Sequence, residues 1–140
     1  MTPRFEDVTV GTELPTLAKV VTREDVKAYA DASGDQNPLH QDDAFARSVG
    51  FPGIIAHGMF TMAHLASCVV GWLGDPAALA RLRVQFREPV FMGETIVAGG
   101  TVRSLDAATR RAIVDVWVTV ERDGAIEHAI GRSEAEVRLA

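Results

Sequence analysis

The longest apolar segment of the chain runs from Gly58 to Leu73 and carries no charged side chain at neutral pH. Apolar residues occupy nearly every face that this segment would have as a helix, and Gly74-Asp75-Pro76 would end it. A helix of this composition has to be surrounded by other elements in a globular protein. It is too short and too interrupted to span a bilayer. We therefore predict a buried central helix and no membrane span.

After this helix, apolar residues recur at every second position, which is typical of strands with one buried face. The pattern predicts four strands, over Arg81–Arg87, Thr95–Leu105, Thr109–Glu121 and Ala125–Leu139. Asp123-Gly124 is a hairpin-turn signal between the last two strands. The pair Gly99-Gly100 predicts a bulge or a strong bend inside its strand.

Before the central helix, the chain begins with strand and helix signals. Thr12–Val21 is typical of a strand, and Pro15 places that strand at a sheet edge or limits its length. Thr22 can cap a helix, with Asp25 at the position of the capping-box acid, and Gly34 would end that helix. This first helix leads directly into the part of the chain that is richest in polar signals.

A short helix over Asp43–Val49 completes the pattern, which predicts an α+β fold with an antiparallel sheet around the central helix. At 140 residues, one domain spanning 1–140 is the simplest organisation. The net charge of −5 argues against non-specific nucleic-acid binding. The single Cys68 excludes an internal disulfide, and the N-terminus lacks the apolar run of a signal peptide. We therefore expect a cytoplasmic protein.

The stretch Ser-Gly-Asp-Gln-Asn-Pro-Leu-His, from position 33 to 40, concentrates the candidate chemistry. On a continuous helix, the side chains of Asp35 and His40 would point about 140° apart. Gly34 and Pro38 break the helix, and Asn37 can close an Asx-type turn ahead of the proline. The sequence therefore predicts a rigid turn that presents a carboxylate and an imidazole together. On these residues alone, the alternative that Asp35 and Asn37 only cap helix ends stays open.

This stretch resembles the signature of the MaoC-like family of (R)-specific enoyl-thioester hydratases and (3R)-hydroxyacyl-thioester dehydratases. The resemblance begins at Tyr29 and continues through the Gly-Asp-Gln-Asn-Pro-Leu-His run. Further blocks follow in family order, over Ile54–Met59 and over Phe86–Val90 with Gly93-Glu94. The resemblance implies a hot-dog fold, in which the antiparallel sheet wraps around the long apolar helix. It implies no metal and no cofactor.

The family's activity is dehydration of 3-hydroxyacyl thioesters or the reverse hydration, which requires an acid and a base at one small site. The resemblance assigns this pair to Asp35 and His40, which would hold the catalytic water together. Which of the two moves which proton stays open, because a coupled pair does not divide its titration cleanly. Asn37 matches the motif as support of the turn.

The enolate-like oxygen of such a thioester needs hydrogen-bond donors. Gly58 opens the central helix, where main-chain N–H groups lack intrahelical partners and the helix dipole favours negative charge. We therefore predict an oxyanion site at Gly58, with His57 and Met59 as neighbouring support. The alternative is that Gly58 only allows the helix to start against a neighbour. Some members of the family carry a serine on this helix; that position is Ala66 here, with Ser67 beside it.

Other polar residues are expected to be structural. His64 and His128 show no metal-ligand spacing, and Cys68 is expected in the core. Arg81, Arg83 and Arg87 share one strand face, which is either a solvated face or a contact for the phosphates of coenzyme A or phosphopantetheine or for an acidic acyl carrier protein.

The expected partners are an acyl-CoA or acyl-carrier-protein substrate and a second hot-dog domain, because one curved sheet leaves an edge open. That domain would be an identical copy or a related, dyad-lacking chain. Within the family, the motifs look closest to dyad-bearing subunits of two-chain dehydratases in mycolic-acid elongation. Two alternatives remain from the residues: a hot-dog thioesterase, disfavoured because Gly58–Leu73 contains no carboxylate, and a non-catalytic subunit that shapes an acyl tunnel.

Overall fold

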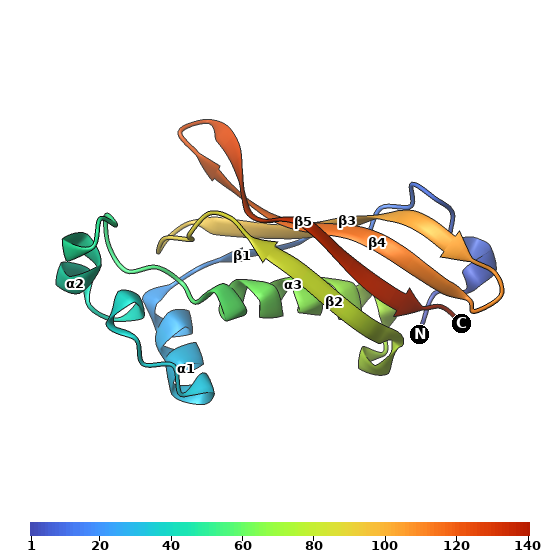
Figure 1. Ribbon diagram of the computed structural model, residues 1–140, viewed down its shortest axis with the longest axis horizontal. Helices are drawn as coiled ribbons and strands as arrows, with labels where there is room; N and C mark the ends of the chain where they lie inside the picture. The colour runs from blue at the N-terminus through green and yellow to red at the C-terminus, as the bar shows by residue number, and fades with distance from the viewer.

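The computed structural model describes residues 1–140 as a five-stranded antiparallel sheet with the long helix α3 (Gly58–Leu73) lying along one of its faces (Figure 1). The strand order is β1-β3-β4-β5-β2. The strands are β1 (Leu17–Val20), β2 (Leu79–Phe86), β3 (Thr95–Asp106), β4 (Arg111–Arg122) and β5 (Ala125–Arg138). The predicted α+β arrangement of a meander over a central helix is confirmed, and the predicted bounds of α3 are those of the structure.

Helices α1 (Arg23–Ser33) and α2 (Asp43–Ser48) lie at the end of the molecule where α3 begins, whereas both chain termini lie at the other end (Figure 1). The predicted capping box forms: the Thr22 hydroxyl accepts from the Asp25 N–H at 3.1 Å, and the Asp25 carboxylate accepts from the Thr22 N–H at 3.2 Å. Short 3₁₀ turns occur at Phe5–Asp7, Pro38–His40 and Pro76–Ala78.

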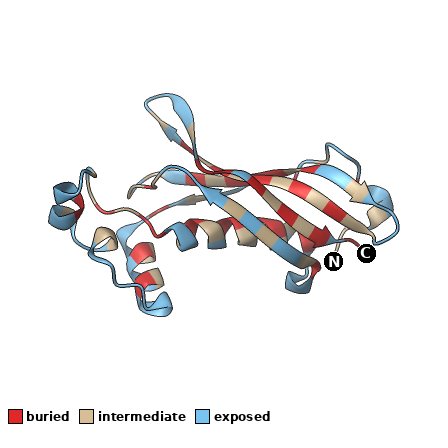
Figure 2. Cartoon of the chain, in the orientation of Figure 1, coloured by how far each residue is buried: buried red, intermediate tan, exposed pale blue.

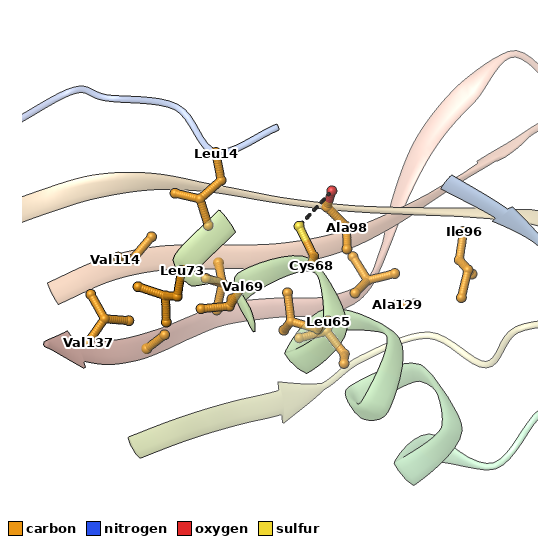
Figure 3. Close-up of a cluster of buried hydrophobic side chains, with 14 of the residues drawn as sticks. Leu14, Leu65, Cys68, Val69, Leu73, Ile96, Ala98, Val114, Ala129 and Val137 are labelled. Atoms are coloured by element: carbon orange, nitrogen blue, oxygen red, sulfur yellow. Dashed lines mark hydrogen bonds between the residues drawn. The ribbon is translucent and has the colours of Figure 1, made fainter. Parts of the chain in front are cut away.

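One face of α3 packs on the sheet and forms the centre of a 24-residue core. Figure 3 shows Leu65, Val69 and Leu73 of α3 beside Ala98, Val114, Ala129 and Val137 of the sheet. Cys68 belongs to the same face, donates from its thiol to the Ala98 carbonyl at 3.6 Å, and has its thiol pKa raised by burial. The predicted core role of Cys68 is therefore confirmed.

The other face of α3 differs from the prediction of a helix surrounded on all sides. Met59, Ala63, Ser67 and Gly71 are exposed along it (Figure 2). The residues of this face are small or apolar and uncharged, so water contacts a surface that the amino-acid pattern marks for burial.

The first strand is shorter than Thr12–Val21, as the expected effect of Pro15 allows, and the bulge predicted at Gly99-Gly100 does not form there. β1 contains only four residues, because Pro15 separates it from an isolated bridge between Glu13 and Thr101. Gly99-Gly100 pairs in regular register with β4, and the register shift of β3 comes later, around Arg103. A Cβ atom at Gly99 would lie 3.0 Å from the Trp117 side chain, so the indole packed against this position explains the glycine, and no bulge is needed.

Other expectations at the ends of the sheet are confirmed. β1 is an edge strand. Asp123 and Gly124 have φ angles of 51° and 77°, as a two-residue hairpin turn between β4 and β5 requires. The tip of this hairpin projects away from the sheet (Figure 1). None of the helices has the length and the apolar character needed to cross a membrane.

Candidate active site

The turn between α1 and α2 forms as the sequence predicts. Gly34 ends α1 in the left-handed region at φ 79° and donates its N–H to the Ala30 carbonyl. Asn37 Oδ1 accepts from the Leu39 N–H at 3.0 Å, which is the expected Asx turn. Asp35 Oδ1 accepts from the Asn37 N–H at 3.2 Å, so the acid is fixed by the same turn.

The structure brings Asp35 and His40 together and adds His57 as a third group. One carboxylate oxygen of Asp35 and one ring nitrogen of each histidine lie within 4.8 Å of one another. Asp35 is exposed and His40 half-buried, so solvent and substrate can reach the pair. The predicted convergence of acid and imidazole is therefore confirmed as geometry.

The tautomer of His40 follows from a single contact. Its Nδ1 lies 2.7 Å from the Ile55 carbonyl oxygen, which can only accept a hydrogen bond. Nδ1 therefore carries the proton, and in the neutral ring Nε2 is left with a lone pair. The imidazole is thus oriented as a proton acceptor at Nε2.

His57 is buried beneath this pair, with 2% of its surface exposed. Its ring stacks on the His40 ring with centroids 3.8 Å apart and planes 24° apart. Its Nε2 donates to the Asp35 main-chain carbonyl at 3.0 Å, while its Nδ1 is buried without a partner. The centroid of the Tyr29 ring lies 4.9 Å from that of the His57 ring, with the two planes tilted by 57°. His57 thus joins the acid-bearing turn to the start of α3 and holds the His40 ring in place.

Residues 54–56, which precede α3, are hydrogen-bonded both to α2 and to the segment before β3. Asp43 of α2 accepts from the Ile54 N–H at 2.9 Å, and Ala56 donates to the Val90 carbonyl at 2.9 Å. The hydrogen bond from Ile54, followed by that of Arg23, holds the pKa of the Asp43 carboxyl below its usual value. These contacts fix the carbonyl of Ile55 and therefore the ring that it orients.

Gly58 lies at the first position of α3, after His57 as the N-cap. No carbonyl accepts a hydrogen bond from the main-chain N–H of Gly58 or of Met59. A cavity of about 190 Å³ adjoins Gly58, and Ile55, Thr61 and Phe86 contribute to its lining. Free N–H groups at a helix start, next to a partly apolar cavity, suit an oxygen that gains negative charge.

The arrangement favours proton transfer over metal binding. The two imidazole rings are stacked with their centroids 3.8 Å apart and in nearly parallel planes, so their ring-plane lone pairs lie in separate layers and do not converge on one ion. One nitrogen of each ring is already engaged by a carbonyl. This leaves the Asp35 carboxylate and His40 Nε2 as acceptors, in a cluster where a carboxylate oxygen and a ring nitrogen of His40 lie within 4.8 Å of each other. Two such acceptors can hold one water molecule by both of its hydrogens.

The remaining candidate residues lie apart from this centre. Met59 is 54% exposed beside Gly58. The Ser67 hydroxyl donates to the Ala63 carbonyl within α3, and the buried His64 bonds to the Leu17 carbonyl. Arg81 and Arg83 pair with Glu134 on the sheet, as expected for a solvated face.

Sequence reasoning missed two contributors to the site. The Ile55 carbonyl sets the His40 tautomer, and Phe86 from β2 lies against Gly58, because a Cβ atom there would be 3.1 Å from its ring. Ile55 stood inside a recognised motif, whereas the place of Phe86 depends on how β2 returns past the start of α3.

Comparison with known proteins shows the family to which this chain belongs. The model of the MaoC like domain matches residues 6–125. A 3-hydroxybutyryl-CoA dehydratase from Methylorubrum extorquens is 38% identical over 111 residues, which are 77% of this chain and 69% of that protein. An (R)-specific enoyl-CoA hydratase from Rhodospirillum rubrum is 32% identical over 102 residues, which are 72% of this chain and 70% of that protein.

A solved structure of a MaoC-like dehydratase superposes on 99% of this chain with a TM-score of 0.90 and 39% identity. This chain spans only 43% of that longer chain. The named relatives are dehydratases and hydratases, which are hydro-lyases, so the predicted family and reaction class are confirmed. The chain therefore belongs to the MaoC-like dehydratase family and has its hot-dog fold.

Proposed function

We propose that this chain interconverts (3R)-hydroxyacyl thioesters and trans-2-enoyl thioesters by acid–base chemistry at Asp35 and His40. The observation that carries the proposal is the pair of neighbouring acceptors, the Asp35 carboxylate and His40 Nε2, with the opposite nitrogen of His40 tied to the Ile55 carbonyl. A water that donates to both acceptors directs its lone pairs toward the substrate, which makes it a nucleophile in the hydration direction.

In the hydration direction, the water loses one proton and C2 of the substrate gains one. The water oxygen bonds to C3 of the enoyl thioester as the C2–C3 double bond shifts its electrons toward the thioester carbonyl. The dyad takes the proton that the water loses and returns a proton to C2, and dehydration runs through the same steps in reverse. We assign the developing thioester oxyanion to the free N–H at Gly58, supported by the positive end of the α3 dipole.

We further propose that the working unit contains a second hot-dog domain, supplied by an identical copy or by a related chain. The exposed face of α3 and the exposed Phe86 beside the site support this. The 39%-identical MaoC-like dehydratase is more than twice as long as the matched part, which leaves room for another domain of this size. An acyl-CoA or acyl-carrier-protein thioester is the substrate, and the free, buried Cys68 suits a reducing cytoplasm.

Incubation of the purified chain with crotonyl thioester tests the reaction. We expect the enoyl absorbance to fall while no free thiol appears, because hydration leaves the thioester intact. Chiral analysis of the product should give the (R)-3-hydroxybutyryl thioester. Release of free thiol would indicate a thioesterase instead, and an unchanged absorbance with every oligomeric form of the chain would refute the proposal.

A further inference from the structure

A second cavity, of about 260 Å³, lies at the end of β2 and is lined only by polar residues and glycine: Arg87, His128, Gly131 and Arg132. The side chains of Arg87, His128 and Arg132 form neither a hydrogen bond nor an ion pair with the rest of the chain. Two guanidinium groups and one imidazole therefore meet in one cavity, and none of them has a hydrogen-bond partner within the chain.

This lack of partners sets the two arginines apart from the others in a chain whose net charge is −5. Arg47 and Arg138 donate to main-chain carbonyls. The remaining eight pair with carboxylates: Arg4, Arg23, Arg81, Arg83, Arg103, Arg110, Arg111 and Arg122. Arg87 and Arg132 are thus the only guanidinium groups left free, and they line the same cavity.

The backbone of β5 is shaped to form this cavity. The register with β2 jumps from Glu134 to Gly131, and the register with β4 jumps from Ser133 to Ile130, so Arg132 belongs to neither ladder. Arg132 has a φ of 51°, in the left-handed region. Bulges of this kind re-aim a side chain away from the regular alternation of a strand and are frequent beside active sites.

Two further contacts maintain this geometry. A Cβ atom at Gly131 would lie 3.0 Å from Cδ of Arg87, so the glycine makes room for the Arg87 stem across β5. The buried Ser133 hydroxyl accepts from the Gln85 N–H at 2.9 Å and donates to the Gly131 carbonyl at 3.0 Å, which fixes the bulge. The cavity is therefore held by buried contacts even though its arginines are exposed.

Arg87 also contributes to the lining of the cavity beside Gly58, so the two cavities share this residue. We propose that Arg87, Arg132 and His128 bind a phosphate group of the carrier to which the acyl thioester is attached. Guanidinium groups suit this ligand because they donate two parallel hydrogen bonds to phosphate oxygens. The inference rests on the proposed function, which puts the thioester at Gly58, and it assigns the carrier end of the same substrate.

Both coenzyme A and the phosphopantetheine arm of a carrier protein bear such a phosphate, whereas a pantetheine thioester bears none. The decisive measurement is the ratio of KM for crotonyl-pantetheine to KM for crotonyl-CoA. We expect Arg132→Asn and Arg87→Gln each to raise KM for crotonyl-CoA roughly 10- to 100-fold relative to the pantetheine substrate. Asparagine is chosen at position 132 because it tolerates the left-handed backbone. Arg138→Gln, at the far end of β5, is the charge-matched control and should leave the ratio as it is in the unmodified chain.

Binding of free coenzyme A, measured by calorimetry, tests the site without turnover. Weaker binding by the two variants, with circular dichroism that matches the unmodified chain, would support the phosphate site even if no thioester were converted. A similar KM change with crotonyl-carrier-protein would attribute the effect to the phosphate next to pantetheine, and a change with crotonyl-CoA alone would attribute it to the nucleotide phosphates. Equal losses with crotonyl-pantetheine, or a loss confined to the carrier-protein substrate, would overturn the proposal.

Discussion

The hydrogen bond from His40 Nδ1 to the Ile55 carbonyl determines where this site can accept a proton. It fixes the protonated nitrogen and leaves Nε2 as the acceptor beside Asp35. The stacked, buried His57 keeps the ring from rotating and also holds the main chain of Asp35. Two segments that are distant in the sequence, 35–40 and 55–57, thus fix one tautomer of the neutral His40 ring.

We expect Asp35→Asn and His40→Ala each to lower kcat by about two to four orders of magnitude, because the first removes the carboxylate and the second the imidazole that can exchange a proton with the water. Neither residue is buried, so circular dichroism should remain that of the unmodified chain. The initial rate of crotonyl thioester hydration is the measurement. Gln36→Ala, an exposed change in the same turn, is the control and should remain active. Near-full activity in a folded variant at position 35 or 40 would remove that residue from the mechanism.

Gly58→Val should reduce activity more than stability. The added atoms would crowd the thioester, but a Cβ atom would also lie 3.1 Å from the Phe86 ring. The double variant Gly58→Val, Phe86→Ala separates these causes, because it removes the ring. We expect the double variant to stay inactive in the hydration assay while thermal unfolding remains cooperative. Recovery of activity in the double variant, or outright unfolding of Gly58→Val, would instead favour a packing role for this glycine.

At the scale of single residues, the sequence was informative where the contacts are local. Gly34 and Pro38 interrupt the helix around Asp35 and His40. Because only four residues separate the acid from the imidazole, their convergence could be predicted from the sequence. The stacking of His57 could not, because it depends on a loop that returns from beyond α2. The position of Arg132 depends likewise on bulges that arise only when β5 pairs with two strands.

At the scale of elements, the segment before α3 is hydrogen-bonded to the turn before β3, and the ion pair between Glu94 and Arg122 stabilises that turn. Glu94 accepts two hydrogen bonds from Arg122, at 2.6 and 2.7 Å, and one from the Phe91 N–H at 2.7 Å. Arg122 also donates to the Pro89 carbonyl and lies over the Phe91 ring. The turn is thereby fixed to the end of β4, and Val90 in turn receives the Ala56 N–H.

We expect Glu94→Gln to lower the free energy of unfolding by about 1–3 kcal/mol, because charge-assisted hydrogen bonds are lost. Burial acts to raise the pKa of the Glu94 carboxyl, but the Arg122 and Phe91 hydrogen bonds outweigh it and lower that pKa. Its stabilising contribution is therefore complete above the unfolded value of about 4.3 and is lost as the pH falls through the lowered pKa.

Chemical denaturation between about pH 6 and about pH 3 measures this contribution. The unmodified chain should lose more stability over that range than Glu94→Gln does, since the variant has no carboxylate to protonate. Glu121→Gln, an exposed change on the same strand, should follow the unmodified chain. Parallel pH curves for the unmodified chain and Glu94→Gln would show that the pair does not stabilise the fold.

Element prediction succeeded where one local signal dominates. The bounds of α3 follow from its uninterrupted apolar run and from Gly74 in the left-handed conformation at its end. The pair Gly99-Gly100 misled the prediction because glycine in a strand marks either a bulge or a close approach, and only the cross-strand Trp117 distinguishes the two. The amino-acid pattern predicted that α3 would be covered all round, and a single chain covers it on one side.

At the scale of the whole molecule, the candidate site is open to solvent. Asp35 and Gly58 are exposed, and Met59 and Phe86 are 54% and 51% exposed next to them. A site that stabilises an oxyanion works best when water is excluded, because electrostatic interactions strengthen in a low-dielectric environment. The isolated chain therefore does not shield the site from water. The edge strand β2, which ends beside the site at Phe86, has no neighbouring strand on its outer side.

We expect the active form to contain two hot-dog domains, which would cover the exposed face of α3 and complete the site. Sedimentation of the purified chain should show a dimer, and activity per chain should fall on dilution as the dimer dissociates. A chain that is monomeric and inactive alone, but gains activity when co-purified with a related subunit, would indicate a heterodimer. Because a dissociated domain would have an uncovered site, activity and dimer formation should show the same dependence on protein concentration. A fully active monomer at assay concentration would refute this arrangement.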